Sequence, residues 1–111
     1  MDPLTTYRTI IQDILLTYTR IPYAHGELEC KPLFDSAHDS YALITLGWDG
    51  PRRVHGCLVH IEIMNAKVWV QRDDTDSGIT YELVAAGIPK NQIILGFQSP
   101  EVRQYTDYAV A

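Results

Sequence analysis

The chain has 111 residues, of which 46% are hydrophobic and 21% charged, and its formal net charge is −5 at pH 7. This composition is typical of one globular domain and excludes a disordered chain, and no apolar run approaches the ~18 residues of a membrane helix. The acidic charge also argues against a protein that binds DNA on its own, because such proteins need a basic face for the phosphates.

The two cysteines, Cys30 and Cys57, lack the CxxC spacing of redox and zinc motifs. In a chain without a secretory signal, such cysteines are typical of buried, reduced thiols. We therefore expect a single domain over residues 1–111, located in the cytoplasm.

A helix is predicted over residues 3–20. Asp2 suits the N-cap and Pro3 the first helical position, while Pro22 ends the pattern. Between these signals, apolar residues recur at helical spacing, which predicts one apolar stripe. Packing of this stripe on a sheet is the favoured interpretation, and a partner-binding helix is the alternative.

Four strands are predicted in close succession, at Glu27 to Phe34, Ser40 to Trp48, Val54 to Met64 and Lys67 to Arg72. Pro32 cannot donate to a strand ladder, which puts the first strand at an edge or at a bulge. The second strand is nearly all apolar, which predicts burial on both of its faces. Asn65 and Ala66 stand where a tight hairpin turn belongs, so the strands form an antiparallel meander.

In the third strand, a period of two places His55 and Cys57 on the face of Val59, and His60 and Glu62 on the opposite face. Each pair offers possible metal ligands. A zinc site needs three or four convergent ligands, and no second cluster of suitable spacing accompanies these pairs. We therefore predict no metal and no cofactor.

The second half of the chain carries two further helix signals. One helix is predicted to begin with Asp74 or Thr75 as its cap and to end at Gly87, and Ser99-Pro100 predicts a short third helix. Residues 92–95 are either a short strand or an extended segment on the core. The predicted fold is therefore α+β, with an N-terminal helix, a four-stranded antiparallel meander and two short C-terminal helices, all helices lying on one side of the sheet.

Four runs of sequence resemble the XisI family, the excision controlling factors named for the fdxN DNA element of nitrogen-fixing cyanobacteria. They are GWDGPRRVHGCLVHIEI, WVQRDDT, ELVAAGIPKNQIILGF and PEVRQYTDYAVA. The resemblance covers nearly the whole chain and is most specific from Lys67 onward. The chain departs from the family at Asn65-Ala66, where an acidic residue and glycine are more usual. It also departs at Gln98, where a histidine is common, which argues against a required metal or catalytic histidine there.

The resemblance implies a role in programmed DNA excision. XisI-like proteins go with a second small protein, XisH, and a site-specific recombinase needs both to excise the element. XisH-like proteins resemble nucleases of the restriction-endonuclease fold. We therefore expect a non-enzymatic controlling factor that acts with an XisH-like partner. The alternatives are a regulator or inhibitor of a nuclease-like XisH partner outside excision, and a metal-dependent enzyme of unknown substrate.

Four aspartates near the predicted strand ends are candidates for a nuclease site; they are Asp49, Asp73, Asp74 and Asp76. A magnesium-dependent nuclease brings two or three carboxylates around one ion. Turn and cap positions already account for these aspartates, and no motif of nucleophilic or phosphate-binding chemistry accompanies them. We therefore predict no catalytic residues.

Arg52 and Arg53 form the main basic pair of the sequence. Two charges neutralise only ~2 phosphates, so we expect no direct DNA binding, and a solvated hairpin tip is the simplest interpretation. The alternative is a protein interface formed by Arg52, Arg53 and Trp69, with Trp48 as a further candidate. Three helices leave part of a four-stranded sheet uncovered, which predicts self-association into a homo-oligomer or binding of a partner.

Overall fold

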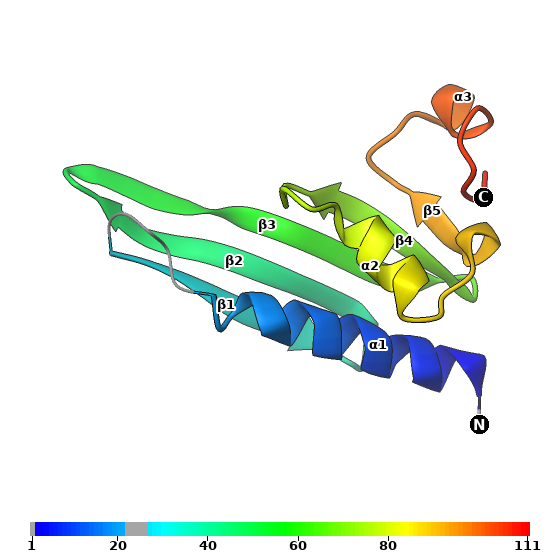
Figure 1. The fold of residues 1–111 in the computed structure, drawn as a ribbon, viewed down its shortest axis with the longest axis horizontal. Coiled ribbons are helices and arrows are strands. Elements are labelled where there is room, and N and C mark those ends of the chain that lie inside the picture. Colours follow the sequence, from blue (N-terminus) through cyan, green and yellow to red (C-terminus); the bar gives the residue numbers. More distant parts are fainter. Residues whose placement is uncertain (1, 22–26) are drawn as a thin grey trace.

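The computed structural model describes residues 2–21 and 27–111. It is an α+β domain, as predicted, in which helices pack against one long twisted sheet (Figure 1). The helices are α1 (Pro3–Tyr18), α2 (Ile79–Ala85) and α3 (Pro100–Arg103), with a 3-10 turn at Lys90–Gln92. The strands are β1 (Glu27–Asp35), β2 (Ser40–Asp49), β3 (Arg52–Met64), β4 (Lys67–Asp73) and β5 (Ile93–Leu95).

The sheet has five strands in the order β1-β2-β3-β4-β5. The first four form the predicted antiparallel meander, with β1 and its Pro32 at an edge. The predicted count of four strands is wrong by one, because β5 adds a short parallel strand beside β4. The crossover through α2 returns the chain in the direction of β4, and a three-residue run gave too little pattern to reveal the pairing.

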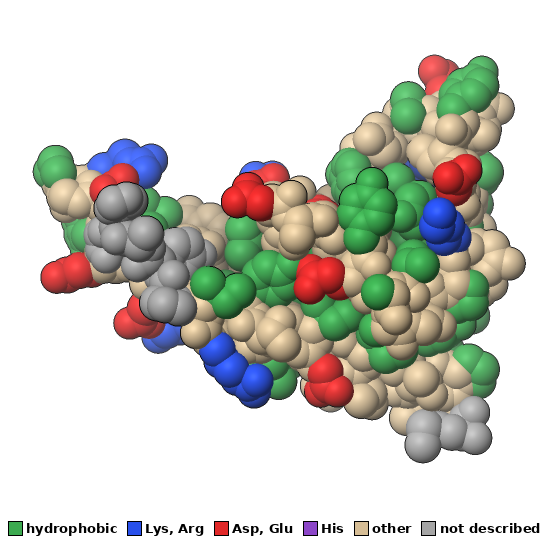
Figure 2. Space-filling view, viewed as in Figure 1, with side chains coloured by type: hydrophobic (Ala, Val, Ile, Leu, Met, Phe, Trp, Pro, Cys, Tyr) green, Lys and Arg blue, Asp and Glu red, His purple; other side chains and the backbone are tan. Residues whose placement is uncertain are grey.

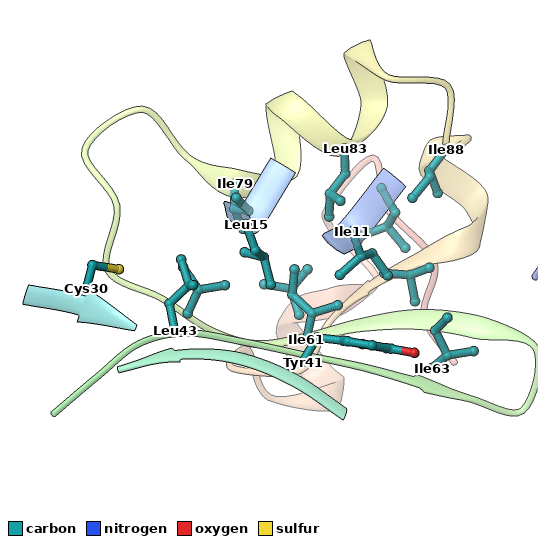
Figure 3. Close-up of a cluster of buried hydrophobic side chains, with 14 residues drawn as sticks. Ile11, Leu15, Cys30, Tyr41, Leu43, Ile61, Ile63, Ile79, Leu83 and Ile88 are labelled. Carbon is teal, nitrogen blue, oxygen red and sulfur yellow. The ribbon is translucent and has the colours of Figure 1, made fainter. Parts of the chain in front are cut away.

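The core lies between one face of the sheet and the helices α1 and α2 (Figure 3). Ile11 and Leu15 of α1 and Leu83 of α2 point onto this face, where they meet Tyr41 and Ile61. All five side chains are fully buried. The predicted packing of the α1 stripe on a sheet is therefore confirmed. In the part of the chain that the structure describes, no helix is long and apolar enough to cross a membrane.

The prediction that all helices lie on one side of the sheet is wrong for α3. Trp69 lies between the buried Val68 and Val70, so its side chain projects from the opposite face. Arg103 of α3 stacks over the Trp69 ring there, with 5.2 Å between the guanidinium carbon and the ring centroid. The chain reaches this face because it turns around the short edge strand β5 instead of packing back beside α2.

The helix starts follow the sequence signals in one case and depart from them in the other. Asp2 caps α1 as predicted, since its carboxylate accepts a hydrogen bond of 3.0 Å from the Leu4 amide. Asp74 and Thr75 do not cap α2, whose N-cap position is Gly78. The carboxylate of Asp73, six residues before the helix, accepts from the Ile79 amide at 2.8 Å instead. A cap that distant in sequence follows no local rule, so the sequence pattern did not identify it.

A charged contact fixes α1 to the turn between β1 and β2. Arg8 donates two hydrogen bonds to the Asp39 carboxylate, of 2.7 and 3.0 Å, and the Tyr41 hydroxyl donates a third of 3.1 Å. The Arg8 guanidinium lowers the pKa of the Asp39 carboxyl below its ordinary value. Asp39 therefore stays ionised at neutral pH and holds the exposed start of α1 against the sheet.

The turn between β3 and β4 stores backbone strain. Asn65 and Ala66 both have positive φ, of 52° and 63°, which is the conformation that a tight hairpin turn requires. Asparagine tolerates this conformation, but the alanine Cβ crowds the following carbonyl oxygen.

Replacing Ala66 by glycine is therefore expected to stabilise the protein by about 1 kcal/mol, the relief of strain less the extra entropy of glycine in the unfolded chain. Urea unfolding measures the change, with Ala85→Gly as the control. Ala85 lies in helical backbone in α2, where glycine should lower stability instead. A loss of stability in Ala66→Gly would contradict the strain.

Candidate interaction surface

The distal half of the β1-β2-β3 sheet extends past the helices (Figure 1). In β2, burial is confined to Tyr41, Ala42 and Leu43, and the strand is half-buried or exposed from Ile44 to Asp49. The prediction that the whole strand is buried on both faces is therefore wrong. The composition of β2 is nearly all apolar, but α1 and α2 cover only one of its faces, and they do not reach its second half.

A β-bulge in β3 changes which side chains share a face. Leu43 of β2 stands opposite Val59, and Ile44 opposite Cys57, so Leu58 is the extra residue. Leu58 packs against the core on the helix side, and Cys57 turns to the opposite face together with His60. The predicted placement of Cys57 on the face of Val59 is wrong for this reason. Because side chains alternate along a strand, His55 lies on the same face as Cys57.

We call the sheet face opposite the helices, over β1, β2 and the distal part of β3, the open face. Along β2 it presents an apolar row in which side chains alternate with a period of two, and Leu33 of β1 lies beside this row; the row is Ala42, Ile44, Leu46 and Trp48. Leu33 is 65% exposed and Trp48 47% exposed. An apolar row with this exposure on a sheet face is typical of a surface that binds another macromolecule.

A shallow hollow of about 470 Å³ marks the inner end of the open face. Cys57 and His60 line it beside Leu33, and His60 Nε2 lies 2.9 Å from the Ser40 hydroxyl. Burial raises the pKa of the Cys57 thiol, and likewise that of Cys30 in the core. Both thiols are therefore protonated at neutral pH, which is the unreactive form.

Basic and aromatic side chains combine at the outer end of the open face. Arg53 lies over the Trp48 ring, 5.4 Å from its centroid, and donates a hydrogen bond of 3.3 Å to the Gly47 carbonyl. Arg52 pairs with Asp49 across the turn at 3.2 Å. Both arginines are exposed, and a stacked arginine is pre-ordered for contact with a partner.

The structure does not bring Trp69 together with the arginine pair. Trp69 stands opposite Glu62, which pairs with Ser40, whereas Arg53 pairs with Trp48 at the other end of β2. At 3.3 Å per residue, these positions are about 25 Å apart along the strands. Trp69 is half-buried beneath Arg103, and Trp48 is the tryptophan beside the arginines. A role of Arg52, Arg53 and Trp69 in an interface stays a prediction.

Three of the four aspartates considered above for a nuclease site have other partners. Asp49 pairs with Arg52, Asp74 pairs with Arg72 at 2.6 Å, and Asp73 caps α2. Over residues 2–21 and 27–111, no three side chains of the types His, Cys, Asp and Glu lie close enough together to hold one metal ion.

Comparison with known proteins relates the chain to one family and to solved structures. The model of the family described as XisI protein matches residues 1–110. A XisI-like protein from Anabaena variabilis has a crystal structure that is similar at a TM-score of 0.89, with 34% sequence identity over 97% of this chain and 99% of that chain. The fdxN element excision controlling factor XisI from the same organism gives a TM-score of 0.84, with 36% identity over 99% of this chain and 100% of that chain. No curated protein matches the chain.

Proposed function

Because this chain belongs to the XisI family, we propose that it is a cytosolic, non-enzymatic controlling factor for the excision of a DNA element by a site-specific recombinase, acting with an XisH-like partner. The family assignment rests on nearly the full chain, and a structurally similar protein with 36% identity is an fdxN element excision controlling factor. The structural observation that supports the proposal is the open face, the apolar sheet surface over β1, β2 and the distal part of β3.

The open face has the composition of a protein-binding surface. Its centre is apolar, its exposed aromatic residue is Trp48, and Arg53 is stacked on the rim. Tryptophan and arginine are enriched among the residues that dominate binding energies. A net charge of −5 disfavours DNA as the ligand of this face, so contact with the recombination machinery runs through a protein.

The chemistry of the polar groups also favours a binding role over catalysis. Both thiols have raised pKa values and are poor nucleophiles. His60 is engaged with Ser40, and Asp74 is neutralised by Arg72. A catalytic site instead needs an activated nucleophile or a base held beside an open position.

Capture of a purified XisH-like protein tests the proposal. Wild-type protein immobilised on a biosensor is expected to bind it, and Leu33→Ser and Trp48→Ser are each expected to weaken binding by about tenfold or more, because each removes apolar surface from the open face. Tyr81→Ser is the matched control. Tyr81 is 71% exposed but lies on α2, on the helix side of the sheet, so its replacement should leave the affinity unchanged.

The outcomes separate the partner from the surface. No binding by folded wild-type protein would overturn the XisH-like partner. Binding that is lost in Tyr81→Ser but kept in Leu33→Ser would overturn the open face as the contact. Far-ultraviolet circular dichroism of each variant confirms that the fold is retained.

A further inference from the structure

The open face separates acidic from basic side chains on the two sides of its apolar row. On β1, Glu27 and Glu29 project from this face, because each stands opposite a residue of the row. On β3, Arg53 and His55 project from it for the same reason. On the helix side of the sheet, by contrast, acidic, basic and hydrophobic side chains are interspersed (Figure 2). The distal part of the open face is therefore bordered by carboxylates along β1 and by basic side chains along β3.

One unpaired charge remains on each side of the row. Lys31 of β1 neutralises Glu29, with 3.4 Å between the charged atoms. In the part of the chain that the structure describes, Glu27 has no ion-pair partner, and Arg53 has no carboxylate partner. The Arg53 Nη1 atom donates to the Gly47 carbonyl, which leaves the other nitrogen donors of the guanidinium free. Each side can therefore still bind a group of opposite charge.

The two unpaired charges flank Trp48 in a single row across the strands. Trp48 stands opposite Glu27 on one side and opposite Arg53 on the other. The two charged residues are therefore two strand spacings apart, which is about 10 Å. Because the tryptophan lies between them, the order across the sheet is acid, apolar, base. This order is self-complementary, since a second copy turned by 180° about an axis along β2 presents base to acid and acid to base.

We propose that two copies of this chain form a dimer by packing their open faces together, like the two sheets of a β-sandwich. The two-fold axis runs along β2 between the two faces, so that β1 of each copy lies over β3 of the other. Glu27 of each copy then meets Arg53 of the other, and the two Trp48 side chains meet near the axis. A two-fold axis across the strands would instead place β1 over β1 and Glu27 against Glu27. Charge complementarity therefore identifies a second copy as the occupant and selects its orientation.

The dimer also removes apolar surface from water and limits access to the open face. The exposed side chains of Leu33 and Trp48 lie in the covered area. The same face is the one that we assign to the XisH-like partner, so self-association and partner binding exclude each other. This competition rests on the proposed function, whereas the dimer does not. The dimer is measured on this chain alone, so a failed capture of an XisH-like protein would leave it standing.

A charge exchange between two variants tests the dimer. In Arg53→Glu, both inter-chain contacts become acid against acid, and in Glu27→Arg both become base against base. Each variant alone is expected to dimerise about tenfold more weakly than wild type in sedimentation velocity over a concentration series. An equimolar mixture is expected to recover dimers, because in the mixed dimer both contacts pair opposite charges. Native mass spectrometry identifies these dimers as mixed.

Arg52→Glu is the matched control for the exchange. It makes the same change of charge at the neighbouring residue, which is exposed and projects from the opposite face of β3, and it should leave dimerisation unchanged. Wild-type protein that stays monomeric at submillimolar concentration would overturn the proposal. Dimers that persist in both single variants, or that the mixture fails to recover, would overturn the pairing through the open face. Equal weakening by Arg52→Glu and Arg53→Glu would do the same, because net charge alone would then explain the effect.

Discussion

Replacing Gly47 by alanine is expected to lower the free energy of unfolding by about 3 kcal/mol, the largest effect of any single methyl group added to the sheet. Gly47 lies in β2 with a φ of +141°, which side chains rarely adopt. A Cβ built on it would lie 1.9 Å from the Glu27 carbonyl oxygen of β1. Because that neighbour is backbone, the clash can be relieved only if β1 and β2 move apart.

Gly56→Ala provides a control in the same part of the sheet. Gly56 lies in β3, two cross-strand pairs from Gly47, and a Cβ built on it would meet no atom within 4 Å. Its replacement should change stability by no more than about 0.5 kcal/mol. Urea unfolding followed by circular dichroism gives both values. Equal losses of stability in the two variants would contradict the clash with β1. They would show that the conformational freedom of glycine alone sets the cost of these substitutions.

The local elements were predictable because each has its own chemical signal. Asp2-Pro3 marked the start of α1, Pro32 marked an edge strand, and Asn65-Ala66 marked the turn between β3 and β4. These signals act within a few residues, so they are fixed before the chain packs. The class of the fold followed from their order.

The composition of the open face was not predictable, because it depends on lengths and on one inserted residue. The bulge at Leu58 turns Cys57 to the face of His60, and no residue type announces it. Trp48 is exposed because it lies on the sheet face opposite α1 and α2, whereas apolar composition alone predicts burial there. The position of Trp69 depends on Arg103, which is 34 residues later in the chain.

The distal part of the sheet has two features that bear on function. It carries the open face, and it contains the segment of β3 that extends beyond β4. An apolar sheet face that is exposed to water is unfavourable, and such faces often mark the site where another macromolecule binds. We expect a partner to bind at this distal part of the sheet, which is also the part that the substitution of Gly47 disturbs.

The second large effect is expected at the opposite end of the sheet, where Arg103→Ala should lower the free energy of unfolding by about 2 kcal/mol. The Arg103 guanidinium donates to the carbonyls of Leu95 and Gln98, at 3.2 and 3.1 Å, and covers the Trp69 ring. It thereby closes the loop that leads from β5 into α3. Without it, water reaches Trp69, and the segment after β5 retains few contacts with the sheet.

Tryptophan fluorescence measures this loss directly, in a Trp48→Phe background that leaves Trp69 as the only tryptophan. Arg103→Ala should shift the emission to longer wavelength and speed proteolysis after Leu95, because both report opening of the same loop. Val102→Ala, at a neighbouring position that is 44% exposed, is the control and should change neither signal. An unshifted emission in Arg103→Ala would mean that the arginine does not cover the ring. The packing of α3 against this face would then rest on the parallel bridge between Ile94 and Ala109.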